Sequence, residues 1–280
     1  MEMNTESQHV YVNGTRFGVV LCGKQEQCKL VLLHGFTGSA VGWGKLLENL
    51  ALPGIQVIAI DMLGHGQSDA PQDPQRYTME HCQTDLLAVL GKLGVSNGDA
   101  ILLGYSMGGR VALSSAFSGF FRALILESAS PGLADPIERE QRRISDMQLA
   151  TKIERDGVAS FVEHWENLPL FASQSSLPDK DRQELHTQRL NNRTLGLANS
   201  LRGLGTGTQP ALHDRLATLD IPILLIAGEL DSKFCEIARS MDHQFPQSQL
   251  HIVPGVGHTV HLEQPEIFVS LVTQFCTLVL

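Results

Sequence analysis

The chain of 280 residues has few of the features that mark metal-binding, disulfide-bonded, membrane-spanning or nucleic-acid-binding proteins. Its five cysteines are scattered and form no C-x-x-C pair, which argues against a disulfide framework and a metal site. No apolar run approaches the length of a membrane span. Basic residues number 21 against 30 acidic ones, and this excess of negative charge disfavours nucleic acid and anionic membranes as partners.

The amino-terminal residues also lack an apolar segment. The stretch 1–8 is polar, which is not typical of a secretory signal peptide. Together with the odd number of cysteines, this predicts a cytoplasmic protein. The sequence leaves open whether the chain is a monomer or a homo-oligomer.

Short apolar runs and amphipathic segments alternate at both ends of the chain. A hairpin is expected over 9–21, with its turn at Asn13-Gly14. Further strands are expected at 29–33, 56–60, 100–103, 123–126, 221–227 and 250–253, and helices over 78–93, from 108, over 234–241 and after 265. This alternation predicts an α/β fold with a mostly parallel sheet covered by helices on both faces.

The alternation stops between 132 and 212, where the sequence is charged, amphipathic and without a convincing strand. We therefore expect a core formed by 1–131 and 213–280. The segment 132–212 would form a helical lid above the carboxyl edge of the sheet, where ligands bind in such folds.

The segment Gly104-Tyr105-Ser106-Met107-Gly108 directly follows one of these apolar runs. A G-x-S-x-G between a strand and a helix is typical of a nucleophile elbow, in which the serine sits on a strained turn at the top of a sheet. The bare pattern also arises by chance, so its meaning depends on the residues that accompany it.

Three accompanying features occur in the order that this chemistry needs. The loop His34–Gly38 follows an early strand and can aim the backbone N–H of Phe36, with that of Met107, at an oxyanion. Asp231 and His258 each follow a later strand. Alone, such residues are more often a turn and a structural histidine. The order Ser106, Asp231, His258 predicts a catalytic triad.

With these motifs the chain resembles the α/β-hydrolase-fold superfamily along its whole length. Asp61-x-x-Gly64-x-Gly66-x-Ser68 matches a loop of that family, and we interpret it as a structural glycine turn. The fold hosts esterases, C–C hydrolases, lyases and non-enzymatic receptors, so it does not fix the reaction.

Arginines distinguish this chain from an esterase with an apolar pocket. Arg110 lies one helical turn after Ser106, and Arg142, Arg143 and Arg189 belong to the expected lid. In an acidic chain this predicts a small-molecule substrate with several carboxylates, because guanidinium binds them bidentately. For any single arginine, a solvated helix face with ion pairs is the commoner explanation.

Several motifs from 30 to 268 are similar to those of the 2-succinyl-6-hydroxy-2,4-cyclohexadiene-1-carboxylate synthases of menaquinone biosynthesis. They are Gly104-Tyr-Ser-Met-Gly-Gly-Arg110, Glu138-Arg139-x-x-Arg142, Trp165-x-x-x-Pro169-Leu170-Phe171, Arg189-x-Asn191-Asn192 and Gly228-Glu229-x-Asp231-x-Lys233-Phe234. The resemblance implies a lyase that eliminates pyruvate from 2-succinyl-5-enolpyruvyl-6-hydroxy-3-cyclohexene-1-carboxylate without metal or cofactor. It implies substrate binding by Tyr105, Arg110, Arg142, Trp165 and Arg189.

Four points stay open at this stage. The adjacent arginines 142 and 143 leave it undecided which one faces the site. The alternatives to a lyase are a serine carboxylesterase or C–C hydrolase that uses Ser106 as nucleophile, and a ligand-binding protein without catalysis. The position of the lid and any esterase side activity are also undetermined.

Overall fold

A computed structural model describes residues 5–280, so the first four residues of the polar amino-terminal stretch lie outside it. One sheet runs through the molecule in the strand order β1-β2-β4-β3-β5-β6-β7-β8. The strands are β1 Thr5–Val12, β2 Thr15–Cys22, β3 Cys28–Leu33, β4 Ile55–Ile60, β5 Ala100–Tyr105, β6 Phe121–Glu127, β7 Ile223–Gly228 and β8 Ser248–Val253. Every strand expected from the sequence is present.

The first two strands form the predicted hairpin at one edge of the sheet. Asn13 and Gly14 both have positive φ, of 52° and 71°, as a tight hairpin turn requires. β1 pairs antiparallel with β2, and β2 pairs antiparallel with β4. The remaining neighbours are all parallel.

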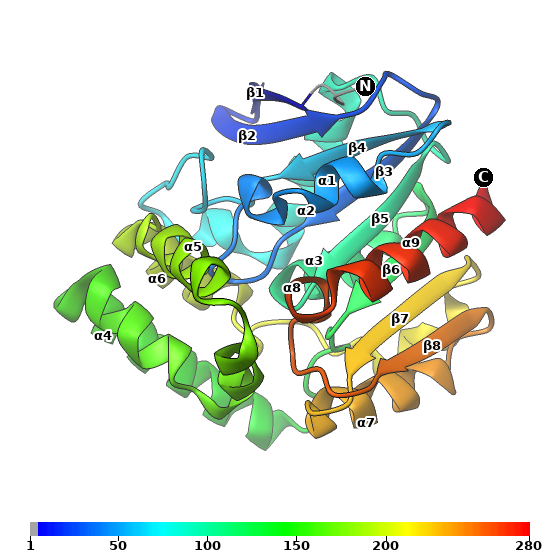
Figure 1. Cartoon of the computed structure of the whole chain (residues 1–280). Helices are drawn as coiled ribbons and strands as arrows, with labels where there is room; N and C mark the ends of the chain where they lie inside the picture. Colours follow the sequence, from blue (N-terminus) through cyan, green and yellow to red (C-terminus); the bar gives the residue numbers. More distant parts are fainter. Residues whose placement is uncertain (1–4) are drawn as a thin grey trace.

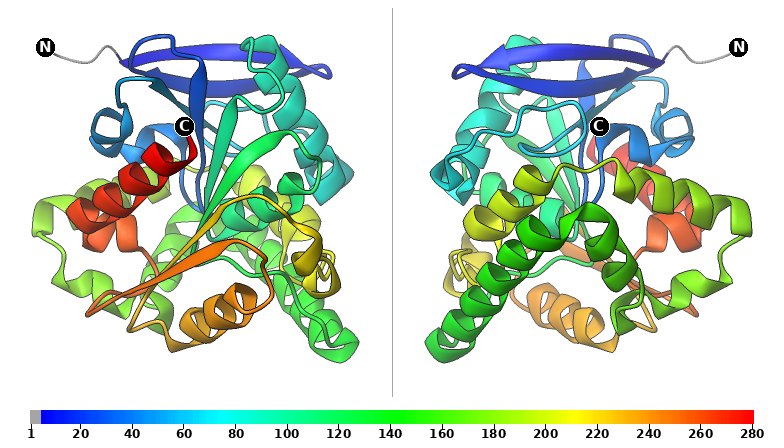
Figure 2. Two further views of the ribbon diagram at one scale, coloured as in Figure 1. Left: turned by 90° about the vertical axis from the view of Figure 1, so that its right-hand side faces the viewer. Right: turned by 90° about the vertical axis from the view of Figure 1, so that its left-hand side faces the viewer.

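Helices cover both faces of the sheet (Figures 1 and 2). On one face lie α1 Leu46–Leu50 and α9 Pro265–Val279; on the other lie α2 Met79–Lys92 and α3 Met107–Ala116, joined by the end of α7 Ser232–Asp242. Successive side chains of a strand alternate between the faces. In β3, Leu30 and Leu32 pack with α1 and α9, whereas Val31 and Leu33 pack with α2 and α3.

Between β6 and β7 the chain forms only helices. Four of them, which we call the lid helices, are α4 Pro136–Glu166, η3 Pro169–Ser176, α5 Asp179–Leu190 and α6 Thr194–Leu204. They gather at one end of the sheet (Figure 1). Asp135 caps α4 by accepting from the amides of Ile137 and Glu138, and a proline occupies the first turn. Gly157, with φ 80° and ψ 171°, breaks α4 in two.

Two glycines of α6 allow this helix to pack directly against the core. A Cβ on Gly196 would stand 2.0 Å from the carbonyl oxygen of Gly64, and one on Gly203 would stand 2.6 Å from that of Tyr77. Gly64 itself has φ 87°. Asp61, at the start of the same loop, accepts from the amide of Gln67 at 2.8 Å. These contacts agree with the structural interpretation of the 61–68 loop.

Four short elements complete the chain: η1 Ala40–Trp43, η2 Pro74–Tyr77, η4 His213–Thr218 and α8 Val260–Glu263.

The strand order predicts where a crevice forms at the edge of the sheet. β3 lies between β4 and β5, so the chain leaves β3 toward one side and later returns on the other. Loops diverge at such a point and leave a crevice at the carboxyl ends of the strands. The loops after β3, β5, β7 and β8 all meet there.

Candidate active site

Ser106 occupies the sharp turn between β5 and α3. Its φ of 50° and ψ of −108° are strained for a residue with a side chain. A Cβ on Gly104 would stand 2.4 Å from the carbonyl oxygen of Gly108, and one on Gly108 would stand 2.3 Å from that of Leu33. The two glycines of the motif are therefore required by backbone packing, and the elbow predicted from the sequence is present.

Ser106, His258 and Asp231 form a continuous chain of hydrogen bonds. His258 Nε2 lies 3.0 Å from Ser106 Oγ, and His258 Nδ1 lies 2.6 Å from Asp231 Oδ2. An ionised carboxylate only accepts, so Nδ1 carries the proton and Nε2 is free to accept from the serine hydroxyl. His258 and Asp231 are both buried. The structure thus brings together three residues that are distant in the sequence.

Aromatic rings surround the imidazole of His258. Phe234 packs edge-on at 4.6 Å between ring centroids, Tyr105 lies at 5.5 Å, and Phe171 of the lid lies at 6.1 Å. Such packing leaves the ring few alternative orientations. The imidazole is therefore held in line between its two partners.

The loop after β3 carries Phe36, and Met107 is the first residue of α3. An amide in the first helical turn has no partner within its own helix, so the N–H of Met107 is free for an oxyanion. The loop is fixed by His34, whose Nδ1 donates to Gly35 O at 2.7 Å and whose Nε2 accepts from Met62 N at 3.0 Å. Accepting requires the neutral ring, and burial lowers the pKa of His34 to about 4.

A cavity of about 610 Å³ lies between the carboxyl edge of the sheet and the lid helices. Ser106, His258 and Phe36 line it. So do all five residues expected to bind substrate, namely Tyr105, Arg110, Arg142, Trp165 and Arg189. Arg143 does not line this cavity; its exposed side chain pairs with Glu140 at 2.6 Å. The undecided choice between the two neighbouring arginines therefore resolves to Arg142.

Arg110 is a half-buried cation that donates to neutral groups. Its guanidinium donates to Leu204 O at 2.6 Å and to Gln209 Oε1 at 3.2 Å. Within residues 5–280 no carboxylate lies at ion-pair distance from it. Burial, together with the nearby charge of Arg142, lowers the pKa of Arg110 to about 10. Arg142 itself is half-exposed and pairs with Asp146 at 2.8 Å.

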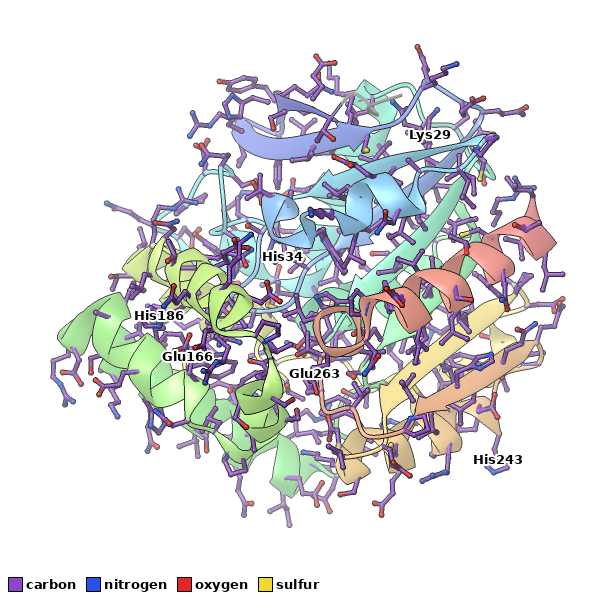
Figure 3. All side chains as sticks on the ribbon, in the orientation of Figure 1. Lys29, His34, Glu166, His186, His243 and Glu263 are labelled. Atoms are coloured by element: carbon purple, nitrogen blue, oxygen red, sulfur yellow. The ribbon has the colours of Figure 1, made fainter. Side chains whose placement is uncertain are left out.

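Unlike Arg110, Arg189 has a carboxylate partner within the protein. It is 5% exposed, pairs with Glu166 at 3.1 Å, donates to Gln174 at 3.0 Å and stacks over Phe171 at 5.3 Å. Glu166 also accepts from His186, and Figure 3 shows these two side chains next to each other in the lid helices. Much of the positive charge of Arg189 is thus compensated by the protein.

Trp165 forms an apolar wall of the cavity. Its ring lies 5.4 Å from Phe36, 5.3 Å from Phe161 and 5.4 Å from Phe171, measured between centroids. These contacts join the lid helices to the loop that carries the oxyanion-hole candidate Phe36. This side of the cavity is therefore apolar.

Sequence reasoning missed a second buried pair behind Tyr105. Glu127, which is fully buried, accepts from His261 Nδ1 at 2.7 Å and from the His261 amide at 2.9 Å. The His261 ring packs edge-on against Tyr105 at 4.8 Å. A carboxylate at the end of an apolar strand, and a second histidine three residues after His258, were the available signals.

Other kinds of site have no support in the part of the chain that is described. Residues 5–280 contain no cluster of three or more His, Cys, Asp or Glu side chains that could hold a metal ion. All five cysteines are buried and unpaired. Over the same residues, none of the helices combines the length and apolarity needed to cross a bilayer.

Comparison with known proteins relates this geometry to a family. Residues 30–265 match the family model described as "alpha/beta hydrolase fold". A Bacillus subtilis protein named "Putative 2-succinyl-6-hydroxy-2,4-cyclohexadiene-1-carboxylate synthase" is 45% identical over 95% of this chain and 96% of its own. The Serratia proteamaculans protein named as the same synthase is 32% identical over 90% and 94%.

A solved structure agrees with these sequence matches. The structure titled as that of MenH from S. aureus superposes with a TM-score of 0.87 at 34% identity, covering 93% of this chain and 97% of the other. The match therefore extends over the sheet and the lid helices together. With a family model spanning most of its length and its serine on the strained turn after β5, this chain belongs to the alpha/beta hydrolase fold family.

Proposed function

We propose that this protein is a carbon–oxygen lyase, a 2-succinyl-6-hydroxy-2,4-cyclohexadiene-1-carboxylate synthase that eliminates pyruvate from its enolpyruvyl precursor. The names of the 45% and 32% identical relatives support this reaction. The observation within the molecule that carries it is Arg110. A half-buried guanidinium without a carboxylate partner, in the same cavity as Ser106, favours an anionic ligand over a neutral ester.

In this proposal Ser106 is a general base toward carbon. His258 accepts the serine proton at Nε2 while Ser106 Oγ takes a proton from the substrate ring, and Asp231 stabilises the imidazolium that forms. The electron pair of the broken C–H bond moves through the ring, and the C–O bond to the enolpyruvyl group breaks. The group leaves as the enolate of pyruvate, and protonation of its methylene carbon, with the proton released by the imidazolium, gives pyruvate and restores the base.

The amides of Phe36 and Met107 would stabilise the negative charge that develops on the succinyl carbonyl oxygen. Arg110 and Arg142 would bind substrate carboxylates at one side of the cavity. Arg189 and Trp165 would bind at the other side, where the apolar wall lies. Holding the substrate at several points lowers the entropic part of the barrier.

The test is to incubate the purified protein with the enolpyruvyl precursor and measure pyruvate release. The proposal predicts turnover by the wild type and loss of turnover in Ser106→Ala. Lack of pyruvate release by a folded wild-type protein would refute it.

A serine hydrolase is the second candidate, because the Ser106–His258–Asp231 hydrogen bonds are also those of an esterase or C–C hydrolase. The two reactions differ at Ser106: hydrolysis passes through an acyl-enzyme, whereas elimination needs only a base. Rapid quench followed by intact-protein mass spectrometry separates them. The lyase proposal predicts unmodified protein throughout turnover.

We also propose a cytoplasmic location, supported by the five unpaired cysteines. For the domain division we propose core segments 1–131 and 213–280 with the lid over 132–212, supported by the positions of the lid helices.

A further inference from the structure

A chain of side-chain hydrogen bonds crosses from the lid helices to the core beside His258. Arg189 donates to Gln174 Oε1 at 3.0 Å, and Gln174 Nε2 donates to Thr259 Oγ1 at 3.0 Å. Thr259 Oγ1 in turn lies 2.8 Å from the hydroxyl oxygen of Tyr105. All four residues line the cavity, and Arg189, Gln174 and Thr259 are nevertheless at most 7% exposed.

The direction of the first two bonds is fixed by chemistry. A guanidinium has five donors and no acceptor, so Arg189 can only face the carboxamide oxygen of Gln174. The NH₂ group of Gln174 is then the end that reaches Thr259, and it can only donate. Thr259 Oγ1 is therefore an acceptor in this bond.

The last bond follows from the burial of Thr259, which is 1% exposed. In the described residues its hydroxyl reaches Gln174 and Tyr105 and no third group. If Tyr105 donated to it, the Thr259 proton would be buried without an acceptor, which is costly. Thr259 therefore donates to Tyr105. Burial also raises the pKa of Tyr105, so the phenol keeps its own proton.

We propose that Gln174 and Thr259 are positioning residues that hold Tyr105 as an obligatory hydrogen-bond donor toward an anionic oxygen of the substrate. Three bonds run in one direction from Arg189 to Tyr105, and the only free proton at the end is the Tyr105 hydroxyl hydrogen. Its natural acceptor in the cavity is a carboxylate or a developing oxyanion. That part of the inference rests on the proposed function, whereas the direction of the bonds does not.

The most discriminating variant is Gln174→Glu, which keeps the shape of the side chain and reverses the direction of the hydrogen bonds. A carboxylate accepts from both Arg189 and Thr259, so Thr259 then accepts from Tyr105, whose lone pairs face the substrate. We expect kcat/KM for pyruvate release to fall at least as far as in Tyr105→Phe, about ten- to hundredfold, as for a lost hydrogen bond to a charged group.

The double variant separates this role from a structural one. In a Tyr105→Phe background there is no phenol proton to redirect, so the loss caused by Gln174→Glu should shrink several-fold. Gln183→Glu adds the same charge on an exposed position of α5 and is the matched control; its activity should equal that of the wild type. Equal, independent losses in the two backgrounds would overturn the proposal.

A second measurement does not depend on activity. Neutron diffraction from crystals of the perdeuterated wild-type protein should place the Thr259 deuteron on the line to Tyr105 Oη. A Tyr105 deuteron on the line to Thr259 would overturn the inference even if pyruvate is released. Conversely, the expected deuteron without pyruvate release would leave the bond direction standing and refute the proposed function instead.

Discussion

The two walls of the cavity are built differently. The sheet wall presents Ser106 and His258, which are fixed by strained backbone, glycine contacts and short hydrogen bonds within the core. The lid wall presents Trp165 and Arg189, which are fixed mainly by other side chains of the lid helices. Direct polar contacts from α5 to the loop after β3 are few, among them Gln188 Nε2 to Ser39 Oγ at 3.0 Å.

In the proposed function, this difference separates the residues of the chemical step from those that recognise the substrate. Groups that move protons need a fixed geometry, and the sheet edge supplies it. Groups that recognise substrate charge can lie on helices inserted into the fold, because changing them leaves the sheet intact. Arg110 is the exception, since it belongs to α3 and lies on the core side. The following predictions test this division, from the largest effect to the smallest.

Removing the base should have the largest effect. We expect Ser106→Ala to lower kcat for pyruvate release by roughly 10³-fold or more, with a smaller change in KM, because the three hydrogen-bonded residues act as a unit. Asp231→Asn and His258→Ala should act similarly. Steady-state kinetics checks this. Near-normal turnover by Ser106→Ala would place the chemistry outside the sheet wall.

Arg110 should matter more than Arg189 for recognising the substrate charge. We expect Arg110→Ala to lower kcat/KM by roughly 30- to 1000-fold, the effect of losing a charge-assisted pair worth about 2–4 kcal/mol. Lysine should rescue only part, because it lacks the planar fork. Arg189→Ala should cost less activity, since Glu166 already compensates its charge.

Hydrolysis of a small neutral ester, where measurable, is the control for both arginines. It should change little in either variant, because nothing in such a substrate needs a guanidinium. Equal losses with both substrates would mean that the arginines support the fold.

Acid should destabilise the sheet wall through His34. Its pKa is about 4 in the folded protein and about 6.5 when unfolded, so between these values the unfolded chain binds the extra proton. The free energy of unfolding should therefore fall as the pH drops through this window, by up to about 1.4 kcal/mol per pH unit for this residue.

Urea unfolding at several pH values checks that slope. In His34→Gln the slope should be shallower but not zero, because burial lowers the pKa of His65 to about 3 in the same direction. Asp61, whose pKa is raised by burial, opposes the trend at the acid end. Curves of the same slope for the two proteins between pH 5 and 6 would contradict the assignment.

The contact between α5 and the core should matter least. Gln188→Ala removes one neutral hydrogen bond to Ser39, so we expect a loss of about 0.5–1.5 kcal/mol of stability and less than a tenfold change in kcat. Thermal unfolding and steady-state kinetics measure both, with the exposed Gln183→Ala as control. A kinetic loss as large as that of Ser106→Ala would show that the two walls are not separable.

Much of the sheet, including its wall of the cavity, was predictable because the signals are local. Asn13-Gly14 encodes its own turn, and the glycines around Ser106 encode the elbow. The order of Ser106, Asp231 and His258 along the chain could be read directly.

The partners in the lid wall could not be predicted in the same way. Glu166 pairs with Arg189 from a different helix, and Gln174 meets Thr259 across 85 positions of sequence. Such pairs depend on how the helices pack. The local sequence of a charged, amphipathic segment does not indicate which residue a carboxylate or amide will contact. Glu127 and His261 were missed for the same reason.

The glycine contacts beneath α6 have a consequence for how substrate enters. Because the backbone of Gly196 packs against Gly64 without room for a methyl group, α6 lies in close contact with the core. The α5 side is held less tightly: within residues 5–280, the lid side chains that hydrogen-bond to the loop after β3 are Gln188 and Asn192, so we expect substrate to enter there. Efforts to widen the entrance or admit bulkier substrates should therefore redesign α5 and leave α6 untouched.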